Sequence, residues 1–193
     1  MIRRARPEDA AALAALWAEV EPDSVWSRLG PVAGTAFFRR YTASGPDLGV
    51  TAWDGDALLG ACVGTTQPLR RLYGRRTPGL ALAIARAVLA RPGRARALRG
   101  GAGSTGEGGD DLLARPGTAY MENFFVAAQA RGRRLGTLLL ERFATEMADR
   151  GCHWCVVHTT AENVGSQRAQ ERAGFECVRR HGEDLFYLRA LAP

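Results

Sequence analysis

The sequence contains no lysine. All 26 of its basic residues are arginines, and against 20 acidic residues they give a formal net charge of +6 at pH 7. Arginine presents a planar, permanently charged fork that suits bidentate contacts with phosphates and carboxylates. The bias therefore points to a nucleic-acid partner or a phosphorylated cofactor, but a GC-rich genome would produce the same composition. Composition alone does not choose between these explanations.

The sequence also lacks an apolar run long enough to span a bilayer. Its most apolar stretch, Leu80–Ala90, is shorter than the roughly 18 residues required and contains Arg86. Near the N-terminus, Glu8 and Asp9 interrupt what would be the apolar region of a signal peptide. We therefore expect no transmembrane helix, no membrane partner, and a cytoplasmic protein whose four cysteines are reduced thiols.

Acidic residues are absent from one long segment, Ala57–Gly106, which holds nine of the arginines. The surplus positive charge thus belongs to one segment of an otherwise mildly acidic chain. Such a segment could bind nucleic acid or an anionic surface, but its single aromatic residue, Tyr73, offers little for base stacking. We favour a solvated or partner-packed helix over a nucleic-acid site. A lid or the contact of a homodimer are further alternatives.

The length of 193 residues, with 46% hydrophobic and 24% charged content, is typical of one soluble globular domain. Apolar periodicity and turn signals predict strands that alternate with helices, which indicates an α/β fold with a mixed sheet and helices on both faces. We expect a single domain over residues 1–193 with a basic helical and glycine-rich insertion at about 68–117. The expected strands cover residues 2–5, 48–53, 57–66, 118–126, 152–159, 175–180 and 185–189. The expected helices cover residues 7–20, 24–41 with a break near Gly30-Pro31, 78–91, a short piece ending at 99, 135–150 and 166–173. We expect a flexible linker at residues 100–109.

The stretch from Phe125 to Thr137 carries the strongest chemical signal. A strand ends at Val126, a turn rich in glycine and arginine follows, and a helix begins at Leu135. Unpaired backbone N–H groups and the positive end of the helix dipole then face one place, an arrangement that suits a pyrophosphate. An ordinary strand-to-helix loop is the alternative.

Within this stretch the chain resembles the GCN5-related N-acetyltransferase (GNAT) superfamily. The signature of that superfamily at this point is Arg or Gln, two free positions, Gly, one free position, then Gly or Ala. Arg131 occupies the first place and Gly136 the last, whereas Arg134 stands at the usual middle glycine. An arginine there still offers its N–H to a phosphate, but it needs a permitted φ and either crowds the phosphate or contacts it.

Two further stretches are similar to the same superfamily. Asn163, Ser166 and the run Gln170-Glu171-Arg172-Ala173-Gly174-Phe175 match its downstream pattern, and the opening strand followed by Pro7-Glu8-Asp9-Ala10 matches its beginning. The resemblance implies a GNAT acyl-CoA N-acyltransferase fold, with a central, mostly antiparallel sheet, helices on both faces and a splay between the fourth and fifth strands. It also implies acetyl-CoA as co-substrate, and no metal.

The resemblance implies three groups of cofactor-binding residues. Two groups flank the pantetheine arm: backbone groups from the strand before the loop on one side, and two polar residues after the fifth strand on the other. The third group supplies amides to the pyrophosphate. The implied residues are Phe125 and Val126; Asn163 and Ser166; and Arg131, Gly132, Arg133, Arg134, Leu135, Gly136 and Thr137.

The resemblance also suggests a catalytic base. A lysine-type amine with a pKa of about 10.4 is almost wholly protonated at pH 7, so its acetylation benefits from a group that removes a proton. Glu122 is the one acid between Asp111 and Glu141, and family members often carry a catalytic Glu on this strand. An ion-paired or edge-strand carboxylate is the alternative. Because side chains alternate along a strand, we expect Tyr120, Glu122 and Phe124 to share one face, with Tyr120 beside the carboxylate.

The leaving thiolate raises a second proton question. Many family members are thought to protonate it with a tyrosine at the position held here by Gln170, and glutamine has no titratable proton. We therefore expect the proton to come from solvent, from the amine, or from a substitute tyrosine, either Tyr120 or Tyr187.

Cys152-His153-Trp154-Cys155 has the two-residue spacing of zinc and redox motifs. On a strand, however, Cys152 and Cys155 would point to opposite faces, and no second cysteine pair exists. We expect buried thiols here rather than a metal site.

These observations predict an N-acetyltransferase that moves the acetyl group of acetyl-CoA directly to a primary amine of a small molecule or peptide. The alternative is a module of the same fold that binds CoA, nucleic acid or protein with little turnover. The identity of the acceptor does not follow from the sequence.

Overall fold

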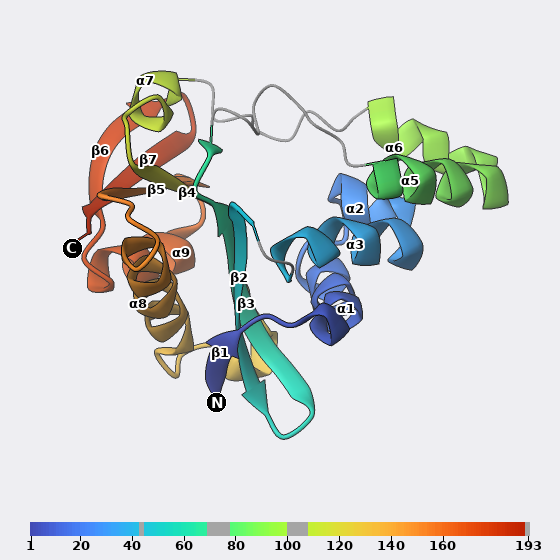
Figure 1. Ribbon diagram of the computed structural model, residues 1–193, viewed down its shortest axis with the longest axis horizontal. Helices are drawn as coiled ribbons and strands as arrows, with labels where there is room; N and C mark the ends of the chain where they lie inside the picture. The colour runs from blue at the N-terminus through green and yellow to red at the C-terminus, as the bar shows by residue number, and fades with distance from the viewer. Residues whose placement is uncertain (43–44, 69–77, 100–107, 192–193) are drawn as a thin grey trace.

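The computed structural model describes residues 1–42, 45–68, 78–99 and 108–191. Strands within these ranges form one mixed sheet in the order β1-β2-β3-β4-β5-β7-β6 (Figure 1). All neighbours are antiparallel except β4 and β5, which run parallel. The strands are β1 (Ile2–Arg4), β2 (Asp47–Asp54), β3 (Ala57–Thr65), β4 (Thr118–Val126), β5 (Trp154–Thr160), β6 (Glu176–His181) and β7 (Asp184–Ala190).

Helices cover both faces of this sheet (Figure 1). One face packs against the N-terminal helices through a core that includes Leu13, Phe38 and Phe125. The other packs against a long helix through Leu139 and Phe143. The N-terminal helices are η1 (Pro7–Asp9), α1 (Ala10–Val20), α2 (Val25–Leu29), α3 (Pro31–Phe38) and η2 (Arg39–Tyr41); the long helix is α8 (Leu135–Ala148), preceded by η4 (Ala128–Ala130) and followed after β5 by α9 (Val164–Arg172).

The predicted strands and long helices are all present, with bounds that shift by a few residues. One short helix, α7 (Asp110–Leu113), was not predicted, because four residues are too few to show helical periodicity. Its Leu112 and Leu113 are buried against Val156 and Phe186. The expected glycine-rich linker falls on residues 100–107, outside the described residues, apart from Gly108 and Gly109.

The segment expected to be a basic insertion contributes α5 (Pro78–Ala90), η3 (Pro92–Arg94) and α6 (Ala95–Arg99). Leu80, Ile84 and Ala87 of α5 join the core of the N-terminal helices, as does Ala97 of α6. In Figure 1, α5 and α6 lie beside α2 and α3, on the side away from β5, β6 and β7. The insertion therefore extends the helical layer rather than the sheet.

The two cysteines of the Cys-x-x-Cys stretch differ from expectation. Cys152 and Cys155 are buried in the same core cluster, so the prediction that they point to opposite faces is wrong. The reason is that β5 begins only at Trp154, and the strand alternation does not reach Cys152. Burial raises the pKa of both thiols.

Over the described ranges, no group of three His, Cys, Asp or Glu side chains is placed to hold a metal ion. No helix there is both long and apolar enough to cross a membrane.

The parallel pair β4 and β5 separates partway along its length. Thr118–Met121 pairs with Trp154–Val157, and the pairing ends there. Beyond this point, β4 remains paired only with β3, and β5 only with β7. The predicted splay between the fourth and fifth strands is therefore confirmed.

A β-bulge lies in β4 where the splay begins. Val63 pairs with Asn123, but the next residue, Gly64, pairs with Met121, so Glu122 is the extra residue in β4. Bulges break the regular alternation of a strand and are common beside active sites, where they redirect a side chain.

The bulge corrects the expected directions of the side chains. Phe124 packs with the α8 core, whereas Glu122 accepts a hydrogen bond from Tyr41 on the opposite face of the sheet. The prediction that Tyr120, Glu122 and Phe124 share one face is thus wrong for Phe124, because the inserted residue changes the phase of the alternation.

Candidate active site

Glu122 lies half-buried at the mouth of the splay. Its Oε2 accepts a hydrogen bond of 2.6 Å from the hydroxyl of Tyr41, a buried residue at the end of η2. The two residues are 81 positions apart in the chain, so the helical layer and the sheet must both be formed before they meet. The contact fixes the position of a carboxylate where β4 loses its partner strand.

Tyr120 meets a histidine across the two strands. Its hydroxyl lies 2.8 Å from Nδ1 of His158, and the two rings stack with centroids 6.0 Å apart. Burial lowers the pKa of His158, and the carboxylate of Asp184 opposes this effect only in part. The imidazole is therefore neutral at pH 7, and the tautomer it adopts decides whether Nδ1 donates to the tyrosine oxygen or accepts from its hydroxyl.

The structure places these residues on the same side of the sheet but in two separate pairs. Tyr120 borders the cluster beneath α7, and Tyr41 belongs to the cluster beneath α1 and α3. Glu122 is thus held by Tyr41, and Tyr120 is held by His158. Sequence reasoning missed Tyr41 and His158. His158 follows directly after the last β4–β5 pair, a place that only the strand pairing reveals.

The loop between β4 and α8 presents backbone N–H groups outward. Gly132 has φ +76° and Arg134 has φ +60°, and residues 131–134 are exposed. No side chain caps the N-terminus of α8, so the first amides of that helix have no partner within it. The guanidinium groups of Arg133 and Arg134 form no ion pair with any described residue. The exposed loop thus brings together free backbone amides, the positive end of the α8 dipole and two arginine side chains.

The end of β4 is tied to this loop. Nε of Arg131 donates to the carbonyl of Val126 at 3.2 Å, while the N–H of Ala127 donates to Leu59 in β3 at 2.8 Å. Since backbone groups alternate between the two edges of a strand, Val126 faces the splay, and Phe125 faces β3. Of the two residues implied to contact the pantetheine arm, Val126 therefore has its backbone at the splay.

Replacing Arg134 with glycine is expected to raise the free energy of unfolding by about 1 kcal/mol, because glycine adopts a positive φ without the strain that an L side chain suffers there. Over the described residues, Arg134 is the one non-glycine residue with positive φ. The substitution keeps the amide, so we expect binding of CoA to persist. Denaturant unfolding and calorimetry with CoA measure the two effects.

Arg133→Gly is the matched control, because Arg133 does not share the positive φ. This variant is expected to be no more stable than the original chain. A loss of CoA binding in Arg134→Gly beyond about tenfold, equivalent to 1.4 kcal/mol, would mean that the guanidinium and not the amide is the important contact.

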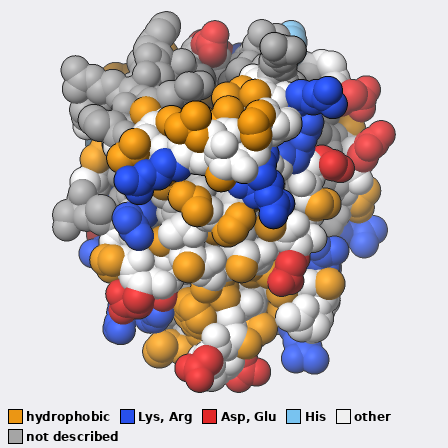
Figure 2. All heavy atoms as spheres, turned by 90° about the vertical axis from the view of Figure 1, so that its right-hand side faces the viewer, with side chains coloured by type: hydrophobic (Ala, Val, Ile, Leu, Met, Phe, Trp, Pro, Cys, Tyr) orange, Lys and Arg blue, Asp and Glu red, His pale blue; other side chains and the backbone are white. Residues whose placement is uncertain are grey.

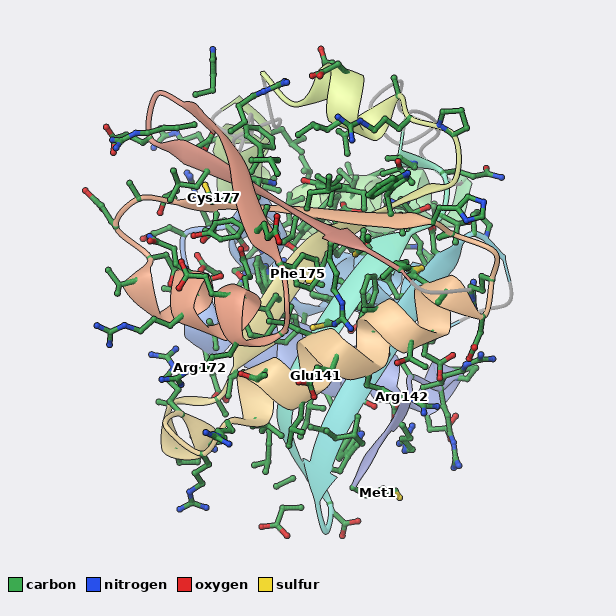
Figure 3. The ribbon with its side chains drawn as sticks, turned by 90° about the vertical axis from the view of Figure 1, so that its left-hand side faces the viewer. Met1, Glu141, Arg142, Arg172, Phe175 and Cys177 are labelled. Carbon is green, nitrogen blue, oxygen red and sulfur yellow. The ribbon has the colours of Figure 1, made fainter. Side chains whose placement is uncertain are left out.

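Gly136 allows α8 to approach the sheet closely. A Cβ at this position would lie 2.9 Å from the ring of Phe124. The last position of the loop signature therefore needs a residue without a side chain, so that the first turn of α8 can reach the end of β4. Figure 3 shows α8 and α9 side by side on this face, and Gly136 also lies close to Ala169 of α9.

The implied residues of α9 form one hydrogen-bonded chain. Oδ1 of Asn163 accepts from the N–H of Ser166 at 3.1 Å and caps the helix. Oγ of Ser166 accepts from Nε2 of Gln170 at 2.9 Å. Gln170 is fully buried, and its Oε1 has no hydrogen-bond partner. An unpaired buried carbonyl oxygen is costly, so it indicates a place where a ligand donor would be stabilising.

Tyr187 is less suited to a role at the splay. It belongs to the α8 core, on the opposite face of the sheet from the cluster that Tyr120 borders. Its hydroxyl donates to Glu171 over 3.4 Å, and burial together with that carboxylate raises the pKa of Tyr187. Of the two substitute tyrosines considered, Tyr120 is the one beside the splay.

The chain resembles known proteins at two levels. A sequence model of the acetyltransferase (GNAT) family matches residues 14–175. No curated protein sequence matches the chain.

Solved structures share the fold at low sequence identity. An aminoglycoside 6'-acetyltransferase type Ii is 12% identical with a TM-score of 0.62, over 100% of this chain and 98% of that one. The ribosomal-protein-S18-alanine N-acetyltransferase of Escherichia coli is 12% identical with a TM-score of 0.60, over 100% and 94%. The PaiA N-acetyltransferase of Thermoplasma acidophilum, solved in complex with coenzyme A, is 11% identical with a TM-score of 0.58, over 98% of each chain. Because the family match covers most of the sequence and the splayed sheet agrees with it, the chain belongs to the GNAT acetyltransferase family.

Proposed function

We propose that this chain transfers the acetyl group of acetyl-CoA to a primary amine of a small molecule or peptide. The observation that supports this most is the pair of proton-carrying contacts, Tyr41–Glu122 and Tyr120–His158, beside the opening between β4 and β5. We also expect the cytoplasmic location inferred from the sequence.

The described residues fit acetyl-CoA in three places. The amides from Gly132 to Thr137, with Arg133 and Arg134 nearby, suit the pyrophosphate. The backbone of Val126 offers hydrogen-bonding groups at the splay, and Oε1 of Gln170 in α9 is a buried acceptor without a partner. When bound, acetyl-CoA supplies an activated thioester whose thiol, with a pKa of about 8.5, leaves readily.

Glu122 removes a proton from the acceptor amine. The free amine nitrogen then attacks the acetyl carbonyl carbon, so that a C–N bond forms as the C–S bond breaks, and the nitrogen releases its second proton to solvent. Tyr41 donates to the carboxylate and keeps it oriented toward the splay. This position places the carboxylate to accept a proton from a nitrogen that enters the splay.

Tyr120 donates its hydroxyl proton to the departing sulfur and regains a proton from solvent. In the tautomer that carries its proton on Nδ1, His158 donates a hydrogen bond to the tyrosine oxygen and leaves the hydroxyl proton free for the sulfur, while burial keeps the imidazole neutral. This assignment replaces the tyrosine that the family usually carries at the position of Gln170.

Replacing Tyr120 with phenylalanine is expected to lower kcat by about 10- to 100-fold, toward the lower end of the effect of a general acid, since a thiolate is a tolerable leaving group. Tyr187→Phe serves as the matched control and should leave kcat unchanged, because Tyr187 lies on the opposite face of the sheet. Steady-state kinetics with a thiol-release assay distinguish them. An unchanged kcat in Tyr120→Phe would mean that the thiolate takes its proton from solvent or from the amine.

Two measurements test the function as a whole. Calorimetry with acetyl-CoA and CoA should show binding well below millimolar concentration, and its absence would exclude the transferase. A thiol-release assay over polyamines, amino acids, peptides and aminoglycosides then identifies the acceptor class. Tight CoA binding without turnover on any amine would instead support the alternative of a binding module with the GNAT fold.

A further inference from the structure

Two acid-free segments of the sequence meet in space. Residues 24–46 contain no Asp or Glu, and neither do residues 57–106. The first segment forms α2, α3 and η2. The second forms β3 and then α5, η3 and α6, and of these α5 and α6 pack against α2 and α3. We call the described parts of these helices, residues 24–42 and 78–99, the basic lobe.

The basic lobe carries eight arginines and no acidic residue. Five of their side chains are exposed: Arg28, Arg39, Arg86, Arg91 and Arg96. Within the described side chains of the lobe, only Arg40 forms an ion pair, with Asp47 of β2 at 3.7 Å. The positive charge of the lobe is therefore left for a partner to neutralise.

The same surface exposes large apolar side chains. Among the side chains that the structure describes, eight large hydrophobic ones are exposed, and four of these belong to the lobe: Val32 is 56% exposed, Leu82 53%, Leu89 80% and Leu98 42%. Figure 2 shows hydrophobic and basic side chains next to one another on this side of the molecule. Such a mixture differs from a purely solvated charged face, on which leucine would be unfavourable.

A groove of about 430 Å³ runs between α3 and α5. Val32 and Ala36 of α3 and Arg39 of the adjoining η2 line one wall, and Leu82 and Arg86 of α5 line the other. Both walls thus have the three- and four-residue spacing of one helix face, and an arginine stands on each. A third helix fits such a groove when an apolar stripe enters it and acidic side chains lie along its edges.

We propose that the groove between α3 and α5 binds an acidic amphipathic helix of a partner protein. Charge complementarity identifies the partner as acidic, because the lobe offers unpaired arginines and no carboxylate. The exposed Val32 and Leu82 require an apolar stripe, which nucleic acid lacks. A concave groove suits an inserted helix better than the broad surface of an anionic membrane. The inference does not depend on the proposed acetyl transfer.

The test uses the full chain and a fluorescent, end-blocked peptide of about 18 residues, long enough to form a helix. Leucines at helical spacing form one stripe of this peptide, and glutamates occupy the other positions. A control peptide has the same composition with the leucines dispersed. We expect micromolar binding of the striped peptide by fluorescence anisotropy, weakened by added salt, and much weaker binding of the dispersed one.

Variants in the groove and on the opposite side of the molecule test where the peptide binds. Arg86→Glu and Leu82→Ser are each expected to weaken binding by about tenfold or more, because each removes a central contact. Both side chains are exposed, so thermal melting by circular dichroism should be unchanged. Arg172→Glu is the matched charge control, since Arg172 is exposed at the end of α9 on the opposite side of the molecule (Figure 3).

Three results would overturn the proposal. The first is equal binding of the two peptides, and the second is equal binding by the Arg86→Glu and Arg172→Glu variants. The third is binding of phosphatidylglycerol vesicles or of single-stranded RNA with no binding of the striped peptide.

Discussion

Replacing Glu122 with glutamine is expected to lower kcat/KM for a lysine-type amine by about 100- to 10,000-fold, the range of general acid–base catalysis. Glutamine has the same shape and its carbonyl oxygen can still accept the hydrogen bond of Tyr41, so the bulge and the splay should persist. What is lost is the ability to take up a proton. CD spectra and CoA affinity should therefore remain unchanged while turnover falls.

The pH dependence separates this role from a structural one. At neutral pH almost every acceptor amine is protonated, and the deficit of Glu122→Gln is largest. As the pH approaches about 10, the amine loses its proton without help and the deficit should shrink. A deficit that is constant with pH would indicate a positioning role for Glu122 instead.

Two controls accompany the experiment. Glu141→Gln changes an exposed carboxylate on α8 and should leave kcat/KM unaltered (Figure 3). Tyr41→Phe removes the hydroxyl that orients Glu122 and should reduce kcat by less than Glu122→Gln, with an unchanged pH profile. Undiminished activity of Glu122→Gln would remove Glu122 from the role of base.

Much of the fold could be predicted because its elements are encoded locally. The strands β2 and β3 flank the Asp54-Gly55-Asp56 turn, and the repeat from Leu135 to Met147 faces one core. The loop that we propose for the pyrophosphate likewise lies within one continuous stretch of sequence. Such features depend on neighbours a few residues apart, which a single sequence displays.

The parts of the site that could not be predicted from the sequence depend on contacts between residues far apart in the chain. Tyr41 reaches Glu122 across 81 positions, and Tyr120 reaches His158 across 38. No local pattern marks either pair, since both depend on how the helical layer and the splayed strands are assembled. The meeting of the two acid-free segments is of the same kind, because α3 and α5 become neighbours only through tertiary packing.

The bulge at Glu122 was missed for a different reason. Sequence alternation assumes that both strands of a pair advance together, and nothing in β4 alone reveals an extra residue. The residue that permits it stands on the partner strand: Gly64 faces Met121 where Val63 faces Asn123. A glycine within a strand often marks such a close approach of two backbones.

Gly64→Ala is consequently expected to lower the free energy of unfolding by about 3 kcal/mol, at the upper end of the cost of overpacking a core. The added Cβ would overlap the carbonyl oxygen of Tyr120, and it would lie 2.6 Å from the ring of Phe143 and 2.9 Å from Cα of Met121. Two of these three neighbours are backbone atoms, which cannot rotate away. For a domain of this size the loss corresponds to a fall in Tm of about 6–12 °C, measurable by calorimetry.

The variant should also lose activity under conditions in which it remains folded, because β4 can relieve the overlap only by moving at the bulge that directs Glu122. Gly79→Ala is the matched control: a Cβ at Gly79 meets nothing within 4 Å, and alanine favours the first turn of α5, so stability should stay the same or rise by up to about 1 kcal/mol. If Gly64→Ala proved as stable and as active as Gly79→Ala, β4 would tolerate displacement at its bulge. The position of the Glu122 carboxylate would then depend on Tyr41 rather than on the pairing of β3 with β4.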